Sequence, residues 1–198
     1  MTDRQNILIL VFHPLLHKSR VNHELLRSVE DLEGVTIRLM YDLYPDFHID
    51  AKAEQELLLQ HDVVVWQHPF YWYSSPSLLK EWIDIVLEHG FAYGREGKAL
   101  QGKKVMTTIS AGGRRDVYQE GGLRRFSIRQ LLAPFEQTVN LCNMNYLPPF
   151  VVHGTHLLDQ EGIRNAGKEY RKVIQSLRDD IFNEEELYSN EYLNDLIT

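Results

Sequence analysis

The sequence predicts a three-layer α/β domain in which five parallel strands, in the order 2-1-3-4-5, have helices on both faces. Three observations support this: short apolar runs that fit strands, intervening stretches whose apolar residues have helical spacing, and their regular alternation along the chain. Such alternation forms a parallel sheet through right-handed crossovers, and five strands favour this order. The 198 residues, 43% of them hydrophobic, suffice for one core of this kind.

Strands are expected where β-branched residues and leucine form nearly continuous runs, as in strands that are buried on both faces. The clearest runs are residues 6–12, with ILILV at their centre, and residues 62–67, with VVVW. Three more strands are expected at residues 35–40, 103–110 and 146–153. Ligands bind such sheets at the carboxyl ends of the strands, so we look for function in the loops after strands one, three and four.

Helices are expected between these strands. The clearest is residues 77–88, where the apolar side chains form one stripe. The others are expected at residues 21–32, 51–60, 123–144 with a break near Pro134, and 159–178. Gly34 suits the end of the first helix, and residues 41–50 are expected to form a loop.

Composition and motifs argue against several classes of function. The formal net charge of −7 argues against nucleic acid as a partner. Cys142 is the only cysteine, which excludes an intrachain disulfide and a thiolate metal cluster and predicts a small buried side chain. His13 and His17 lie in a loop and no HExxH motif occurs, so no metal site is expected. Neither a Walker sequence, nor GxGxxG, nor GxSxG is present, so a P-loop, a Rossmann dinucleotide site and a Ser-His-Asp hydrolase are not indicated.

The negative charge is concentrated at the C-terminal end. Residues 179–198 hold seven acidic residues and no lysine or arginine, whereas the rest of the chain holds 21 residues of each sign. Large apolar side chains such as Tyr192 and Leu193 make this stretch too apolar for simple disorder. We therefore divide the chain into a domain, residues 1–180, and an acidic C-terminal extension, residues 181–198. The extension is expected either to pack on a second copy or another partner, or to be a frayed end.

The loop after the first strand, residues 13–22, leads into a helix. Ser19 and Asn22 surround the N-terminus of that helix, where unpaired N–H groups and the helix dipole favour an anion. Lys18 and Arg20 add positive charge. The alternative is that Ser19 is a simple N-cap.

The loop after the third strand, residues 68–76, contains four consecutive aromatic residues: Phe70, Tyr71, Trp72 and Tyr73. Four aromatic side chains are costly to leave in water, and a loop has few ways to bury all of them. A flat conjugated ring bound at this loop would account for them. Packing into the core is the alternative for any one of them.

The loop after the fourth strand, residues 110–122, carries two glycine pairs on either side of Tyr118. Glycine lets the backbone approach a ligand closely, and Tyr118 is placed to donate a hydrogen bond or a proton. Arg114 and Arg115 are candidates to bind a phosphate, the alternative being that they are solvated.

These loops resemble those of the NAD(P)H:quinone oxidoreductase branch of the flavodoxin-like flavoproteins. The resemblance is closest to the ancillary flavoprotein subunits of glutathione-regulated potassium efflux systems, and it covers residues 5–178. It is carried by residues 13–22, by residues 69–84, by GFAYG at 90–94, and, for the ancillary subunits, by YDLYPDF at 41–47 and LPPF at 147–150.

The resemblance implies a homodimer with two flavin sites at the subunit interface. The flavin phosphate is expected at Ser19, Val21 and Asn22, with His13 nearby. The isoalloxazine ring is expected at Pro69, Phe70, Trp72 and Tyr73, in the loop that Tyr71 completes. Its other edge is expected along Ser110, Gly112, Gly113 and Tyr118, and Tyr93 is expected to reach the substrate pocket of the other subunit.

One residue departs from the family pattern. Quinone reductases of this type often carry a histidine six residues after the matching tyrosine, and here that place is Arg124. An arginine stabilises an anion electrostatically but does not readily shuttle a proton. We therefore expect Tyr118 and Arg124 as the catalytic residues, with Tyr118 and water supplying the proton.

The implied activity is that of an NAD(P)H dehydrogenase (quinone). Reduced NAD(P)H, the co-substrate, gives a hydride to the bound flavin and leaves, and a quinone-like acceptor takes its place in the same pocket. FMN is the expected cofactor and FAD the alternative. The competing hypothesis is a regulatory ancillary subunit that activates a glutathione-gated potassium efflux transporter in the membrane, and an electron-carrier flavodoxin is a third.

A cytoplasmic location is expected. The N-terminal residues lack the basic start and the long apolar segment of an export signal, and no apolar stretch reaches the roughly 20 residues needed to span a bilayer. With a transporter as partner, the location would be peripheral at the inner membrane.

Overall fold

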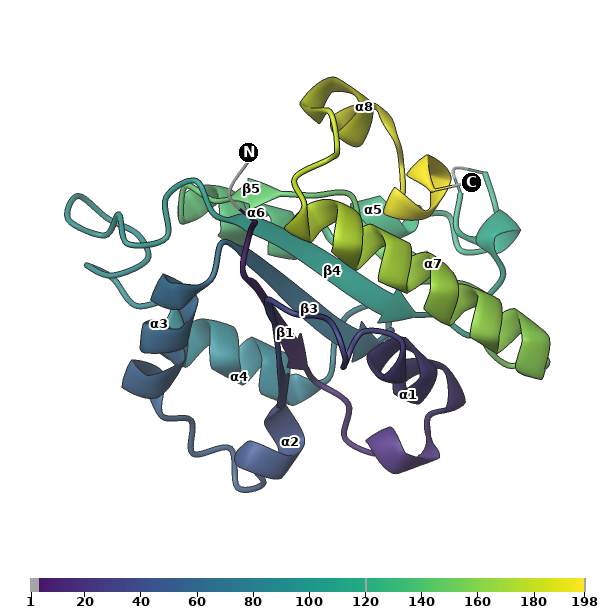
Figure 1. Cartoon of the computed structure of the whole chain (residues 1–198), viewed down its shortest axis with the longest axis horizontal. Helices are drawn as coiled ribbons and strands as arrows, with labels where there is room; N and C mark the ends of the chain where they lie inside the picture. Colours follow the sequence, from purple (N-terminus) through teal and green to yellow (C-terminus); the bar gives the residue numbers. More distant parts are fainter. Residues whose placement is uncertain (1–3, 120, 198) are drawn as a thin grey trace.

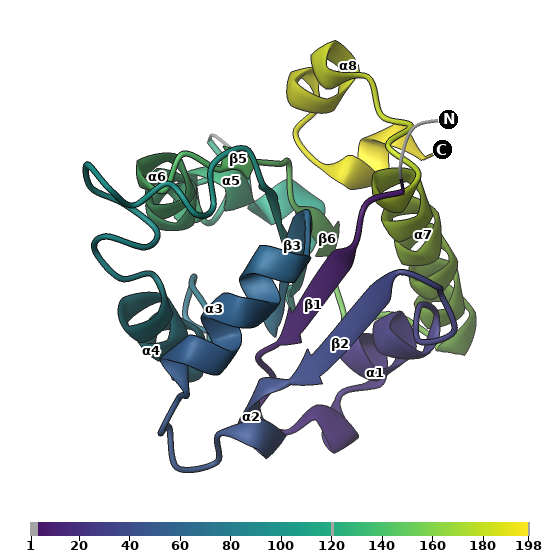
Figure 2. The ribbon, with the colours of Figure 1, turned by 60° about the vertical axis from the view of Figure 1, so that its left-hand side comes forward.

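The computed structural model describes residues 4–119 and 121–197. A parallel sheet lies at its centre, with the strand order β2-β1-β3-β4-β5 and β6 also paired with β4 (Figures 1 and 2). The strands in this part of the chain are β1 (Ile7–Val11), β2 (Val35–Leu39), β3 (Val63–Pro69), β4 (Lys104–Ser110), β5 (Asn145–Tyr146) and β6 (Phe150–Val152). The predicted fold class and strand order are confirmed.

The expected fifth strand is divided into two. Lys104 pairs with Asn145 in β5, and Thr108 pairs with Phe150 in β6, so both short strands occupy the same edge of β4. Pro148 and Pro149 stand between them. Proline has no N–H to donate to a ladder, which explains why the pairing is interrupted there.

Two layers of helices cover the sheet (Figure 2). One face carries α1 (Arg20–Arg27) and α7 (Gln160–Arg178), and the other carries α3 (Ala51–Gln60), α4 (Ser77–Val86), α5 (Ile128–Leu131) and α6 (Ala133–Leu141). The shorter helices are α2 (Met40–Leu43), α8 (Glu184–Ser189), η1 (Leu16–Lys18), η2 (Arg115–Val117) and η3 (Leu193–Leu196). None of the helices in the described ranges is long and apolar enough to cross a membrane.

Three expected segments differ from the structure. The helix expected from residue 123 begins at Ile128, where Ser127 and Gln130 form a capping box. Pro134 marks the expected break because it lies in the first turn of α6, where a missing N–H costs little. The first helix ends at Arg27, before the expected end at residue 32. The short helix α2 occupies the start of the loop that was expected at residues 41–50.

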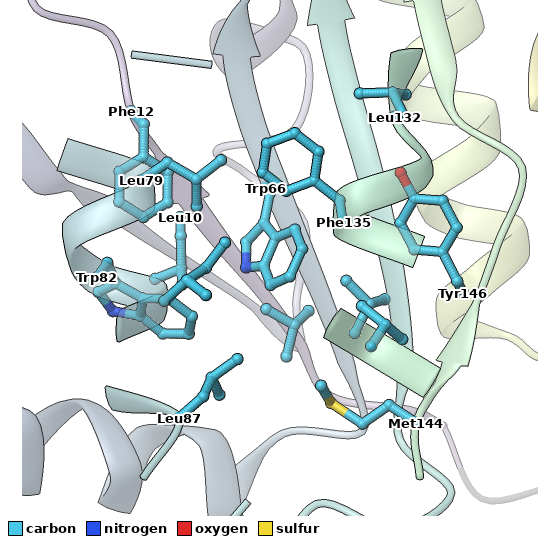
Figure 3. Packing of buried hydrophobic residues seen from close by; sticks show 14 of the residues in the cluster. Leu10, Phe12, Trp66, Leu79, Trp82, Leu87, Leu132, Phe135, Met144 and Tyr146 are labelled. Atoms are coloured by element: carbon cyan, nitrogen blue, oxygen red, sulfur yellow. The ribbon is translucent and has the colours of Figure 1, made fainter. Parts of the chain in front are cut away.

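The two core layers follow from the alternation of side chains along the strands. In β1, Ile7, Ile9 and Val11 face α1 and α7, whereas Leu8 and Leu10 face α3 and α4. Figure 3 shows the second layer, where the ring of Trp66 meets Trp82 and Phe135 edge-on, with centroids 6.3 and 6.0 Å apart. Cys142 lies in this layer and is buried, as predicted, and burial raises the pKa of its thiol to about 11.

The C-terminal segment, residues 181–197, folds back on its own chain. Leu187 and Leu193 are buried in the core layer of α1 and α7, and Tyr192 is buried in the other layer. Figures 1 and 2 both show η3 beside α7. The segment therefore packs on its own subunit, which neither alternative from the sequence described. The domain boundary at residue 180 stays a prediction.

Candidate functional site

A cavity of about 660 Å³ lies at the carboxyl edge of the sheet, where the loops after β1, β3 and β4 meet. Small-molecule sites in proteins commonly measure about 300–1,000 Å³. The cavity is lined by His13, Leu15, Lys18, Ser19, Pro69, Phe70, Tyr71, Trp72, Tyr73, Ser110, Gly112, Gly113, Tyr118, Arg124, Thr155 and His156. Most of the residues predicted for the flavin site are thus brought together.

Three predicted site residues lie outside this lining. Val21 is buried in the core behind the start of α1, and Asn22 is fully buried beside it. Tyr93 and His89 form an isolated β-bridge through their backbones, and their ring centroids are 5.5 Å apart. The side chain of Tyr93 packs against the core. The role of Tyr93 in the site of another subunit stays a prediction.

Ser19 begins α1 at the rim of the cavity. Its hydroxyl oxygen accepts hydrogen bonds from the backbone N–H and the side-chain amide of Asn22, both at 3.2 Å, so the N-cap is present. The cap uses one of the N–H groups that a helix leaves unpaired at its start. The others, together with the neighbouring Lys18, keep this end of the cavity suited to an anion.

A chain of buried hydrogen bonds extends behind Ser19. The Asn22 side-chain amide also donates to the Ser110 hydroxyl at 2.8 Å. Gln67 donates to the backbone carbonyl of Asn22 at 3.3 Å and accepts from the Tyr170 hydroxyl at 3.1 Å. The chain links α7, β3, α1 and the end of β4, and it reaches the cavity at Ser19 and Ser110.

Burial favours the neutral form of the His13 imidazole. Its Nδ1 accepts a hydrogen bond from the Leu15 backbone N–H at 3.1 Å, which leaves the proton on Nε2. Burial lowers the pKa of the imidazole, and the nearby His17 lowers it further, against the effect of its own backbone. His13 therefore forms part of the cavity wall, with its ring edge-on to that of Tyr71.

The aromatic loop is a tight turn that displays its rings. Tyr71 and Ser74 form an isolated antiparallel β-bridge, and between them Trp72 and Tyr73 have φ angles of 50° and 63°. Bulky side chains rarely adopt this left-handed region, and such strain concentrates at functional sites. Trp72 is 93% exposed, whereas Phe70 packs partly against the core. Packing into the core, the alternative for each ring, therefore holds in part for Phe70 and does not hold for Trp72.

The glycines of the third loop make room for neighbouring side chains. A Cβ on Gly113 would stand 2.6 Å from a ring carbon of Tyr118, and one on Gly112 would stand 2.9 Å from Nε2 of His156. Both distances are too short for a real contact. The glycine pair therefore lets Tyr118 and His156 lie against the loop at the cavity wall.

Tyr118 and Arg124 line the cavity at the end formed by the aromatic loop. Burial raises the pKa of Tyr118, although the charge of Arg124 acts in the opposite direction, so the hydroxyl is protonated at neutral pH and can donate. The Arg124 guanidinium donates to the Tyr73 hydroxyl at 2.8 Å. Arg114 pairs with Asp116 and Arg115 with Asp195, and neither arginine is among the residues that line the cavity, so phosphate binding by them stays a prediction.

Five residues of the site were not predicted from the sequence, and one of them is Leu15 in the loop after β1. Thr155 and His156 follow β6 and line the cavity, and their position after the last strand was the available signal. Gln67 and Tyr170 lie behind the lining. Gln67 was visible as a polar residue within an apolar strand run. Among the residues that the structure describes, no three His, Cys, Asp or Glu side chains are grouped as metal ligands.

A family model described as the flavodoxin-like fold matches residues 5–174. The chain belongs to the flavodoxin-like fold family. The family match ends before the C-terminal segment of this flavodoxin-like protein, so residues 181–197 lie outside it.

Solved structures agree with this assignment. General stress protein 14 from Treponema denticola, in complex with FMN, is 37% identical with a TM-score of 0.82, and the match covers 87% of this chain and 99% of that chain. An NADPH-quinone reductase from P. pentosaceus is 33% identical with a TM-score of 0.76, covering 84% and 96%. A structure described as a thermophilic tryptophan halogenase from Streptomycin violaceusniger is 42% identical with a TM-score of 0.82, covering 83% and 96%.

These findings confirm the predicted family resemblance of this flavodoxin-like protein, since a named quinone reductase is among its relatives. The closer resemblance to ancillary subunits of potassium efflux systems stays a prediction.

Proposed function

We propose that this protein is an FMN-dependent NAD(P)H oxidoreductase that reduces a quinone-like acceptor. One observation carries the proposal. A single cavity joins the anion-binding start of α1, at Ser19 and Lys18, to an exposed aromatic turn and the protonated Tyr118. A planar ring that bears a phosphate requires an anion site for the phosphate and an aromatic surface for the ring, and the cavity provides one at each end. The relatives named as an FMN complex and as an NADPH-quinone reductase support the same proposal.

The residues present fit FMN. The start of α1 offers N–H groups and positive charge to a phosphate, and Ser110 offers a hydroxyl beside them. The turn from Tyr71 to Ser74 and the glycine loop flank the remaining space with aromatic edges and backbone groups. FMN is preferred to FAD because no adenine site is evident in the sequence.

The bound flavin would supply the hydride chemistry that protein side chains lack. The chain would bind and orient it. Ser19 and the first N–H groups of α1 would hold the phosphate, and the Tyr118 hydroxyl would donate a hydrogen bond to the ring. Arg124 would supply a positive charge to stabilise the negative charge of the reduced state. Because Arg124 does not readily give up a proton, Tyr118 or water supplies it to the acceptor.

We further propose that the protein acts as a homodimer. Large apolar side chains are exposed at and near the cavity: Leu15 and Trp72 line it, and Leu123 and Phe126 flank the lining residue Arg124 in the sequence. Exposed apolar groups at the rim of a site are typical of an interface. By the family resemblance, Tyr93 of the second subunit is expected to reach the cavity, which Tyr93 does not line in its own chain. The measurement is the mass in solution by light scattering, and a monomer at micromolar concentration would contradict the dimer.

The activity is tested on the purified protein loaded with FMN under anaerobic conditions. NADH or NADPH should bleach the oxidised-flavin absorbance, and a benzoquinone should restore it. An azo dye as a second acceptor tells whether the quinone is preferred. Bound FMN that neither nicotinamide reduces would contradict the proposed activity, although it would leave the binding site in place. No described feature of the structure favours the transporter-regulating alternative, which stays a prediction.

A further inference from the structure

The C-terminal segment contacts the loop that carries Tyr118. Two hydrogen bonds hold its last turn, η3, beside β6. The Leu193 backbone N–H donates to the Pro149 carbonyl at 3.0 Å, and the Asn194 side-chain oxygen accepts from the Val151 backbone N–H at 2.8 Å. Leu193 is fully buried. These contacts fix the position of the neighbouring Tyr192 and Asp195.

Arg115 is held from three sides by this anchored turn. Its two terminal nitrogens donate to the two carboxylate oxygens of Asp195 at 2.7 and 2.8 Å. Its guanidinium lies over the ring of Tyr192, 4.6 Å from the centroid. A carboxylate oxygen of Glu191 lies 3.8 Å from one of its terminal nitrogens. A bidentate pair with a stacked ring fixes the direction of an arginine side chain as well as its charge.

Arg115 passes this restraint to Tyr118 through the backbone. It begins the turn η2, and its carbonyl accepts the Tyr118 backbone N–H at 3.1 Å. A second contact runs through His153, whose ring centroid is 5.5 Å from that of Tyr192 and 6.1 Å from that of Tyr118. The C-terminal segment and the cavity wall are thus joined by two short paths.

We propose that the C-terminal segment is a positioning element for the flavin loop, acting through Asp195 and Tyr192 on Arg115 and thereby on Tyr118. Its role is to hold residues 112–118 in the shape that binds the isoalloxazine ring, so that less ordering is left to the ligand. The family match ends at residue 174, and the matched relatives cover 83–87% of this chain. The C-terminal segment therefore lies outside the part of the chain that the family model matches. This inference rests on the proposed function for its flavin arm.

Substitutions in the pair test the inference better than truncation, because removing the segment would also take Leu187 and Leu193 out of the core. Asp195→Asn removes the charge and leaves the packing of the segment. We expect faster hydrogen exchange at residues 114–118 in the FMN-free protein and FMN binding weakened about fivefold, or about 1 kcal/mol. Because the defect lies in binding, kcat should recover at saturating FMN.

Two further variants sharpen the test. Asp195→Glu keeps the charge and should restore much of the affinity, as should the exchanged pair Arg115→Asp with Asp195→Arg. The matched control is Asp179→Asn, which removes a carboxylate that pairs with Arg178 at the far end of α7. It should leave both exchange at residues 114–118 and FMN affinity as in the wild type.

Wild-type exchange and wild-type FMN affinity in Asp195→Asn would overturn the inference. So would an equal loss of affinity in Asp195→Asn and Asp179→Asn, since that would indicate general destabilisation. Should the wild-type protein fail to bind FMN, the proposed function would fall, and exchange in the FMN-free protein would still decide whether the segment holds the loop.

Discussion

Within residues 4–119 and 121–197, one cluster of buried polar side chains on each face of the sheet can be compared, and the two differ in charge and in where they end. On the face of α3 and α4, the fully buried carboxylate of Glu54 accepts from Arg38 at 2.6 Å, Tyr44 at 2.8 Å and Trp82 at 3.0 Å. Burial and the Glu54 carboxylate raise the pKa of Tyr44 to about 12, so its hydroxyl remains a donor. This cluster is charged and closed, in the sense that its hydrogen bonds join only its own members.

The second cluster, on the face of α1 and α7, is neutral and open. Hydrogen bonds run from Tyr170 through Gln67 and Asn22 to Ser19 and Ser110, which line the cavity. The difference indicates how to interpret buried polarity. A cluster whose groups satisfy one another ties helices and strands together, whereas one that ends at a cavity orients groups toward a ligand.

The largest effect is expected from breaking the closed cluster. Glu54→Ala leaves Arg38, Tyr44 and Trp82 without their acceptor and should lower the free energy of unfolding by about 3–5 kcal/mol. Urea denaturation measures this. Asp84→Ala, which breaks the exposed pair of Asp84 with Lys80 on α4, should cost less than about 0.5 kcal/mol. Where Glu54→Ala is still folded, FMN affinity should be that of the wild type, and a lost affinity would show that the two clusters are not independent.

A buried group outside both clusters should dominate the response to acid. His68 is fully buried, and burial lowers its pKa to about 4, against about 6.5 in the unfolded chain. The folded state resists protonation, so the stabilisation is complete above about pH 6.5 and is lost as the pH falls toward 4, by about 3 kcal/mol in all. His153, whose pKa is also lowered to about 4 by burial first and then by the charge of Arg115, acts in the same direction.

Replacing His68 tests this expectation. His68→Phe should flatten the pH dependence of unfolding free energy between pH 6.5 and 4 without abolishing it, because His153 remains. His23→Gln on the exposed side of α1 serves as the control and should keep the wild-type slope. An unchanged slope in His68→Phe would contradict the assignment.

The smallest effect compares the open cluster with a buried hydroxyl pair that belongs to neither cluster. Tyr170→Phe and Tyr146→Phe each remove one buried hydroxyl, which donates to Gln67 in the first case and pairs with Thr107 at 2.8 Å in the second. Each should cost about 1 kcal/mol of stability. Only Tyr170→Phe should weaken FMN binding, by about threefold, since its partner Gln67 holds Asn22. Equal FMN affinity in the two variants would show that the open chain does not orient the site.

Local sequence predicted most of the fold and much of the site. The ILILV run, the aromatic loop and the glycine pairs each carry their signal within a few residues. Gln67 and Tyr170 do not, because their bond joins β3 to α7 and depends on the crossovers that bring both to one face. The same holds for Arg115, whose partner Asp195 lies 80 residues away in a segment with no strong local pattern.

Titration of the flavin-free protein with FMN and, separately, with riboflavin tests the central claim most directly. The account predicts one FMN per chain, bound at least about tenfold more tightly than riboflavin because only FMN brings a phosphate to the start of α1. A protein that binds neither, or that binds both with the same affinity, would contradict it.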